Sequence, residues 1–346
     1  MKHLPLYALA FLVPLAATLV LTPIAAKLAM RVGMVDRPSA NKHHSETTPY
    51  LGGLAVAGGL ATVGVVAAST SGRLLTVLLA AAVLGGLGLI DDRGGVGPVV
   101  KIIVEVGCAL ALWAVGIRAG LFGLYGLDLM LTVVWVVAVT NAVNMIDNMD
   151  GLSSGLAALA SLTFFLISAG NGDYLVASLA VALAGATLGF LRYNFPPASI
   201  FLGDAGTLMI GFLLAAVSLQ LDLVGETGLV HAAVPVLILA VPLFDMALVV
   251  VGRAMDSRPI YVGGTDHSSH RLARMGFSGR KVALTNYAVQ IVCCCLAIGL
   301  VHVPRPMVMP TVVALGGAAC LLLLGLNSSE RRRMGGTERQ PTPEVG

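Results

Sequence analysis

The sequence predicts an all-α, polytopic membrane protein, and three observations lead to this prediction. Of its 346 residues, 57% are hydrophobic and only 11% are charged, whereas soluble domains carry roughly 25% charged residues. The mean hydropathy is +0.90. Apolar runs of about 20 residues, the length at which a helix crosses a bilayer, recur along the chain with short loops between them. We therefore expect one transmembrane domain over residues 1–326 and no separate soluble domain.

About eleven apolar stretches are wide enough to cross the membrane, and each is bounded by glycine, proline or charged residues. The first begins behind Lys2 in the manner of a signal peptide, but its apolar run is longer than a signal peptide requires, so we interpret it as a span. The predicted spans are 4–28, 51–70, 74–90, 99–117, 129–146, 153–169, 174–191, 207–221, 229–251, 283–301 and 308–326.

The basic residues predict the orientation. Seventeen of the 21 Lys and Arg residues fall at or beyond the ends of the odd-numbered spans, on one side of the membrane. Because cytoplasmic loops collect positive charge, this side is predicted to be cytoplasmic, with the N-terminus outside and the C-terminus inside. Residues 327–346 are expected to form a disordered cytoplasmic tail. The formal charge of only +3, without a basic stripe, argues against a nucleic-acid partner.

The acidic residues gather on the same predicted side of the membrane. Most lie at the mouths of spans rather than at mid-bilayer, so we expect the chemistry at the cytoplasmic face of the membrane. These residues are Asp36, Asp91, Asp92, Asp147, Asp150, Asp204, Asp256 and Asp266.

The first motif is the pair Asp91-Asp92 at the end of the third predicted span. Two adjacent carboxylates leaving an apolar helix are partly desolvated and repel each other, which favours a general base or a cation site. The alternative is a solvated helix end followed by a glycine-rich turn.

The second motif repeats a polar residue at every third position: Asn141, Asn144, Asp147 and Asp150. On a continuing helix these side chains form a slanting ridge of amide and carboxylate oxygens. Such a ridge suits a hard cation or the donor groups of a sugar nucleotide. The alternative is a polar loop in which Asp150 only caps a helix.

The third motif places Asp204 between Gly203 and Gly206, after the helix-stopping pair Pro196-Pro197. A new helix starts near Thr207, and its free N–H groups would favour phosphate oxygens. Asp204 would hold a magnesium ion that bridges those oxygens. The alternative is a simple helix cap.

The fourth motif lies in the longest predicted cytoplasmic loop, where His267 and His270 stand beside Asp266 and Arg271. The two imidazoles suit a pyrophosphate or a zinc ion, and the surrounding arginines favour phosphate. The alternative is a basic loop that only sets topology.

The fifth motif is a basic cluster with Lys42 and His44, ahead of Pro49 and Gly52-Gly53. It suits an anionic lipid headgroup or nucleotide phosphates, although alone it is no more than a basic loop.

Taken together and in this order, the motifs resemble those of the polyprenyl-phosphate N-acetylhexosamine-1-phosphate transferases. This membrane family, glycosyltransferase family 4, includes the WecA and TagO enzymes and the translocase that makes lipid I. The resemblance runs from about Asp36 to Leu272. Family motifs fall on Asp91-Asp92, on the Asn141–Asp150 run and on Gly203, Asp204 and Gly206, with Asn194 upstream and Lys42 and His44 in the first cytoplasmic loop.

Three positions depart from the family pattern. Asn148 replaces the usual glycine of the second motif, Thr207 replaces the usual serine of the third, and Ser269 stands where WecA-like members carry another histidine. The loop also lacks the three-histidine pattern of the lipid I-forming translocase. We therefore expect a WecA-like sugar donor.

The resemblance implies transfer of a sugar-1-phosphate, expected to be GlcNAc-1-phosphate, from a UDP-sugar to undecaprenyl or decaprenyl phosphate, with release of UMP. This reaction is the first membrane step of cell-envelope polysaccharide synthesis. A competing interpretation is a secondary transporter or proton-coupled carrier, in which acids line a pathway near mid-membrane. A third is an inactive membrane scaffold.

The resemblance also implies residue roles and partners. Asp91 takes a proton from the lipid phosphate, Asp92 orients Asp91 or a nearby cation, and Asp204 with the Asn144 amide oxygen holds magnesium, with manganese as the alternative ion. A covalent aspartyl intermediate stays open as an alternative to direct attack. The enzyme is expected to be a homodimer in the cytoplasmic membrane. The expected substrate-binding residues are Lys42, His44, Asn141, Asp147, Asp150, Asn194, His267, His270 and Arg271.

Overall fold

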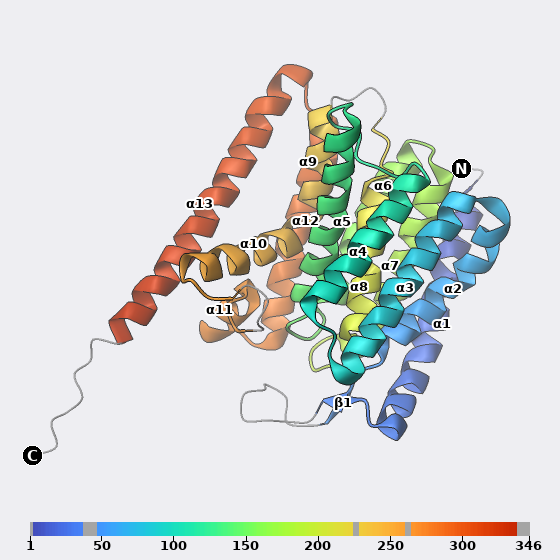
Figure 1. Ribbon diagram of the computed structural model, residues 1–346, viewed down its shortest axis with the longest axis horizontal. Helices are drawn as coiled ribbons and strands as arrows, with labels where there is room; N and C mark the ends of the chain where they lie inside the picture. Colours follow the sequence, from blue (N-terminus) through green and yellow to red (C-terminus); the bar gives the residue numbers. More distant parts are fainter. Residues whose placement is uncertain (1–2, 37–46, 224–227, 260–263, 338–346) are drawn as a thin grey trace, which may run out of the picture.

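The computed structural model is a bundle of helices with one small antiparallel pair of strands (Figure 1). It describes residues 3–36, 47–223, 228–259 and 264–337. The helices are α1 Leu4–Val32, α2 Gly52–Thr70, α3 Gly72–Gly94, α4 Pro98–Ala114, α5 Tyr125–Met145, α6 Leu152–Gly170, α7 Tyr174–Asn194, α8 Gly203–Ser218, α9 Gly228–Ile238, α10 Ala240–Met255, α11 Ser268–Arg274, α12 Gly279–Val301 and α13 Arg305–Thr337, and the strands are β1 Val35–Asp36 and β2 Thr48–Pro49.

Ten of the eleven predicted apolar stretches each coincide with one helix, and the stretch 229–251 covers two, α9 and α10, so the all-α, polytopic class is confirmed. Within the described residues, seven helices are long and apolar enough to cross a membrane, or up to eight if α9 and α10 together form one span. The other predicted spans coincide with α2, α4 and α8, which are not among those seven. The count of eleven and the sides on which the termini lie therefore stay predictions.

The centre of the bundle is α8, whose residues from Ala205 to Ser218 are all buried. A helix that is apolar on every side is surrounded either by protein or by lipid, and the burial of α8 shows that protein surrounds it. Here α3 and α5 pack along it, α2, α6 and α7 also contact it, and α1 packs against α7 further out. The polar start of α8 is thereby held at the end of the bundle where Figure 1 shows β1 and α11.

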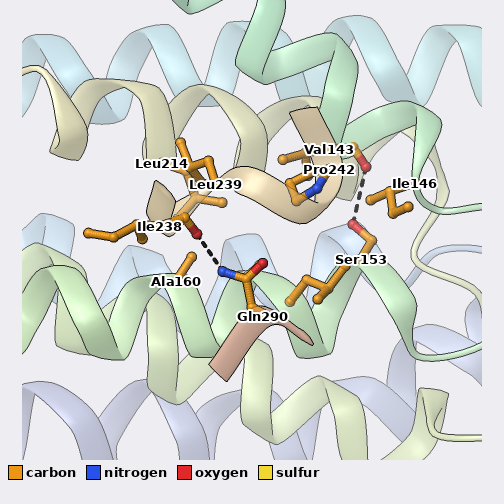
Figure 2. A pocket seen from close by; sticks show the side chains of 11 residues that line it. Val143, Ile146, Ser153, Ala160, Leu214, Ile238, Leu239, Pro242 and Gln290 are labelled. Atoms are coloured by element: carbon orange, nitrogen blue, oxygen red, sulfur yellow. Dashed lines mark hydrogen bonds between the residues drawn. The ribbon is translucent and has the colours of Figure 1, made fainter. Parts of the chain in front are cut away.

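The predicted span 229–251 is broken, because α9 and α10 meet at an angle of 80°. Pro242 lacks the N–H that would bind the Ile238 carbonyl in a continuous helix. The Gln290 side chain of α12 donates to that carbonyl instead, as Figure 2 shows. As a result, α10 does not continue α9 but runs sideways toward α13 (Figure 1).

The C-terminal helix departs from the prediction of a disordered tail from residue 327. α13 continues to Thr337, and Asn327 is buried, with its amide donating to the Leu248 carbonyl of α10 at 3.3 Å. This anchor carries the helix past the predicted boundary at residue 326. Residues 338–346 lie outside the described part of the chain.

Candidate active site

One lysine joins two of the predicted acidic motifs. The Lys101 Nζ atom, in the first turn of α4, lies 2.5 Å from Asp91 Oδ2 and 2.6 Å from Asp204 Oδ2. Asp91 ends α3 and Asp204 begins α8, so the ammonium group ties together the ends of three helices. All three side chains are partly buried, between 14% and 28% exposed. The site therefore combines a shared cation with carboxylates that retain access to solvent.

Sequence reasoning missed Lys101 as a site residue, because it counted this lysine only as a topological charge. The sequence nevertheless contained a signal that could have identified Lys101. A lysine inside an apolar helix is costly unless it is paired, and such residues mark functional sites by default.

Asp92 has a different position from its neighbour Asp91. Its Oδ1 accepts the backbone N–H of Asp204 at 2.9 Å and its Oδ2 that of Ala205 at 3.2 Å. A carboxylate at a helix start satisfies free N–H groups and interacts favourably with the helix dipole. Two of the N–H groups expected for phosphate are therefore already bound by Asp92.

Glycines make this approach of α3 and α8 possible. Gly203 has a φ of +72°, which L side chains rarely adopt, and a Cβ there would lie 2.7 Å from Asp92 Oδ2. A Cβ at Gly88 would collide with the backbone of Asp204. Any larger residue at either position would push the two motifs apart.

Asn144 joins the second motif to the third. Its amide nitrogen donates to Asp204 Oδ1 at 3.0 Å and to Thr207 Oγ1 at 2.7 Å. The structure therefore brings Asp91, Asn144 and Asp204 into one cluster, through direct contacts among these residues and Lys101. Thr207, one of the departures from the family pattern, supplies the hydroxyl that the contact needs.

Asp147 lies in the turn after α5, where it is half-buried. Burial raises its pKa to about 8, and the negative charges of Asp204, Asp92 and Asp150 add to this effect. Burial, with a smaller contribution from the neighbouring carboxylates, thus keeps Asp147 protonated at neutral pH.

Three other residues that were predicted to contact substrate form hydrogen bonds within the protein. Asn141 donates to Glu105 Oε2 of α4 at 2.6 Å. Asp150 accepts the Ala198 backbone N–H at 2.8 Å. Asn194 is buried; its oxygen accepts from Gly151 N and Ser154 Oγ, and its nitrogen donates to the Ile200 carbonyl. The bond of Asn141 joins α5 to α4, and the bonds of Asp150 and Asn194 hold the turns around the cluster.

The histidine loop reaches the second motif through its serine. Ser269 Oγ donates to Asn148 Oδ1 at 2.5 Å, so two of the departures from the family pattern contact each other. The rings of His267 and His270 are 5.7 Å apart, centre to centre. The start of α11 therefore lies beside the turn that carries Asp147.

Two charged residues of this loop bind other parts of the scaffold. Asp266 pairs with Arg253 of α10 at 2.8 Å. Burial opposes ionisation of Asp266, but the hydrogen bond from Arg253 and the charges of Arg258 and Arg253 outweigh it and hold its pKa below the usual value. Arg271, predicted to bind substrate, donates to the Leu326 carbonyl and to Asn327 Oδ1 of α13. Its contact with substrate stays a prediction.

The structure describes no contact for the basic cluster of the first loop. Lys42 and His44 lie in 37–46, outside the described residues, so their phosphate-binding role stays a prediction. The strands that flank this segment pair antiparallel, Val35 with Pro49 and Asp36 with Thr48.

The cluster has the oxygen donors that magnesium prefers. Both hydrogens of the Asn144 amide are engaged by Asp204 and Thr207, which leaves the amide oxygen for a cation. Among the residues described, no three Asp, Glu, His or Cys side chains are grouped closely enough to hold a metal ion. The residues thus fit an ion that takes its remaining ligands from substrate phosphates, as magnesium usually does.

Comparison with known proteins relates this site to characterised families. The family model "Glycosyl transferase family 4" matches residues 74–222, the segment that holds the carboxylate cluster. A Bacillus subtilis protein named "Probable undecaprenyl-phosphate N-acetylglucosaminyl 1-phosphate transferase" is 35% identical over 291 residues, which cover 81% of each chain.

Two further relatives have names of the same kind. "Decaprenyl-phosphate N-acetylglucosaminephosphotransferase" of Mycobacterium tuberculosis is 33% identical over 338 residues, covering 86% of this chain and 84% of the relative. "Undecaprenyl-phosphate alpha-N-acetylglucosaminyl 1-phosphate transferase" of Salmonella typhi is 28% identical over 272 residues, covering 75% and 74%. These names give no support to the transporter interpretation. With these motifs in one cluster and relatives matched over most of its length, the chain belongs to glycosyl transferase family 4, the family of polyprenyl-phosphate N-acetylhexosamine-1-phosphate transferases that its motifs resemble.

Proposed function

We propose that the protein transfers GlcNAc-1-phosphate from UDP-GlcNAc to a polyprenyl phosphate, giving polyprenyl-diphosphate-GlcNAc and UMP. The observation that carries this proposal is the position of Lys101 between Asp91 and Asp204. An ammonium group held by two carboxylates at a helix junction is placed to receive phosphate oxygens. The names of the relatives supply the sugar and the lipid.

Both substrates are polyanions, so the reaction depends on positioning and on stabilisation of negative charge. Asp91 accepts the proton of the lipid phosphate. The freed phosphate oxygen attacks the phosphorus that carries the sugar, the bond from that phosphorus to the bridging oxygen breaks, and UMP leaves. Lys101 donates to the phosphate oxygens as charge moves onto the leaving group.

Asp204 and the amide oxygen of Asn144 are the residues that would hold magnesium, with manganese as the alternative. The bound ion would neutralise diphosphate charge. Asp92 positions the carboxylates of Asp91 and Asp204, because it follows Asp91 in α3 and binds the backbone at the start of α8. Asp91 and Asp204 therefore act from one rigid junction.

We assign recognition of the UDP-sugar to Asp147, His267 and His270. Lys42 and His44 are assigned to binding its phosphates. Asn141 acts by joining α5 to α4, and Asp150 and Asn194 act through the turns that they hold. The site faces the cytoplasm in this proposal, where UDP-sugars are made, and the protein lies in the cytoplasmic membrane. Homodimer formation stays an expectation from the family resemblance.

The test is turnover by the purified protein. Protein in detergent is incubated with polyprenyl phosphate, magnesium and each of a panel of UDP-sugars, and UMP and the lipid product are followed. The proposal expects UMP release only when lipid acceptor and UDP-GlcNAc are both present, and loss of activity on chelation of divalent ions. Turnover with a different UDP-sugar alone would overturn the donor, and uptake of a solute into proteoliposomes without UMP release would overturn the reaction.

A further inference from the structure

A buried carboxylate of α10 lies outside the five sequence motifs. Asp245 is in α10, within the predicted span 229–251, and is 0% exposed. A carboxylate in such a position is costly unless donors satisfy it. It therefore calls for a specific partner.

The donors all come from the start of α11. Asp245 Oδ2 lies 2.7 Å from His267 Nδ1, and Asp245 Oδ1 accepts from the Ser268 backbone N–H at 2.7 Å and from the Ser268 hydroxyl at 2.6 Å. Ser268 gives Asp245 two hydrogen bonds in the acceptor role of a carboxylate. A carboxylate oxygen that also accepts from Nδ1 selects the tautomer with the proton on Nδ1, which makes Nε2 the acceptor nitrogen of the ring.

Other contacts already hold α11 in place. Ser269 binds Asn148 beyond α5, Asp266 pairs with Arg253 of α10, and Arg271 binds Asn327 of α13. The helix thus has anchors to three elements besides the Asp245 contacts. Asp245 is consequently more than an attachment point, because it alone among these anchors contacts the His267 ring.

We propose that Asp245 is a positioning residue that fixes the tautomer and direction of His267, so that Nε2 accepts a hydrogen bond from a hydroxyl group of the bound nucleotide sugar. This inference rests on the proposed function and adds a residue to it. The chemistry is that of a carboxylate orienting an imidazole, in which loss of the acceptor inverts the tautomer while the geometry persists.

The decisive variant is Asp245→Asn. Its amide NH2 can only donate to Nδ1, which moves the ring proton to Nε2, whereas its oxygen still accepts from Ser268. The matched control is Asp128→Asn, since Asp128 is also a buried aspartate that accepts a backbone N–H, from Phe122 at 2.9 Å, and it lies in the first turn of α5, remote from the cluster.

Two measurements test the proposal. Nitrogen NMR of histidine-labelled protein, with the His267 signals assigned by their loss in His267→Gln, reports which ring nitrogen carries the proton. Steady-state kinetics give KM for UDP-GlcNAc and for polyprenyl phosphate separately. We expect Asp245→Asn to move the proton to Nε2 and to lower kcat/KM for the nucleotide sugar by roughly 10- to 100-fold, with an unchanged KM for the lipid.

The combination with His267→Gln separates positioning from folding. We expect the double variant to lose no more activity than His267→Gln alone, because both changes abolish the same function, the contact of a correctly oriented His267 with the substrate. Asp128→Asn should behave as wild type. Additive losses, an equal rise in both KM values, or a proton on Nε2 in the wild-type protein would each overturn the inference.

The wild-type spectrum needs neither turnover nor a stable Asp245→Asn variant, so the inference stays falsifiable if that variant does not fold. Absence of UMP release from wild-type protein with every UDP-sugar would instead reject the proposed function, while the tautomer measurement still decides whether Asp245 fixes His267.

Discussion

Asp92 and Asp204 come from different helices, yet the carboxylate of Asp92 accepts the backbone N–H of Asp204 at 2.9 Å. The contact joins the end of α3 to the start of α8, and so fixes the Asp91 carboxylate relative to that of Asp204. Two motifs separated by more than a hundred residues are thereby one structural unit.

The first prediction concerns this contact. Asp92→Ala removes the acceptor of two N–H groups at the start of α8, so we expect a loss of stability of about 0.5–2 kcal/mol together with a strong loss of turnover. Thermal unfolding in detergent and UMP release measure the two effects. Asp173→Ala is the control, because Asp173 caps α7 at the other end of the bundle; it should lower stability while leaving turnover per folded molecule unchanged. Equal activity losses in both variants would contradict the prediction.

The second prediction concerns Lys101. Lys101→Gln removes the charge shared by Asp91 and Asp204, and we expect kcat to fall by roughly 100- to 1000-fold, the scale on which loss of one preorganised donor acts. Lys101→Arg should retain part of the activity, because it keeps the charge but changes the geometry. Exposed Lys281 in the first turn of α12 provides the control Lys281→Gln, with wild-type kinetics expected. Lys101→Gln with kcat near that of wild type would exclude Lys101 from the chemistry.

The third prediction concerns pH. Folded Asp147 keeps its proton up to about pH 8, whereas the unfolded chain releases it near the ordinary value of 3.8. Between these values the unfolded state binds fewer protons, so this residue makes stability fall as pH rises. We expect Asp147→Asn to reduce the fall of Tm between pH 5 and pH 8 in protein free of divalent ions. The exposed Asp222 serves for the control Asp222→Asn, which should keep the wild-type slope; an unchanged slope in Asp147→Asn would refute the prediction.

The fourth prediction concerns the break between α9 and α10. Gln290→Leu leaves the Ile238 carbonyl without its donor, which costs about 1–3 kcal/mol for a buried acceptor. Pro242→Ala restores an N–H near that carbonyl, so we expect Gln290→Leu to cost less stability in that background, as a double-mutant cycle would measure. Gln220→Leu is the control, because Gln220 binds the Ala216 carbonyl of the adjoining helix α8. Full additivity of the two substitutions would show that Gln290 does not replace the missing proline donor.

Length and apolarity are enough to predict the helices, since each span has to satisfy its own backbone in lipid. The break at Pro242 was not predictable, because its stability depends on Gln290, which is distant in sequence. Helix α13 was predicted too short for a similar reason. Its continuation past Asn327 relies on contacts with α10 and α11 that the polar composition of the tail does not indicate.

The site was predictable where residue type and spacing carried the chemistry. Asp91, Asn144 and Asp204 meet as the motifs suggested. Lys101 and Asp245 were missed, because each is a single charged residue in an apolar stretch and only the fold gives it a partner. Asn194 and Arg271 illustrate the opposite case, in which a polar residue near the motifs binds the scaffold.

The absence of a side chain at Gly88 has a consequence for changing the sugar that the enzyme accepts. With the backbone of Asp204 directly against it, there is no room at the junction of α3 and α8 for a library of substitutions. Directed evolution of donor preference should therefore randomise residues 264–270 at the start of α11, where hydrogen bonds of the side chains of Asp266, Ser268 and Ser269 hold the backbone in place.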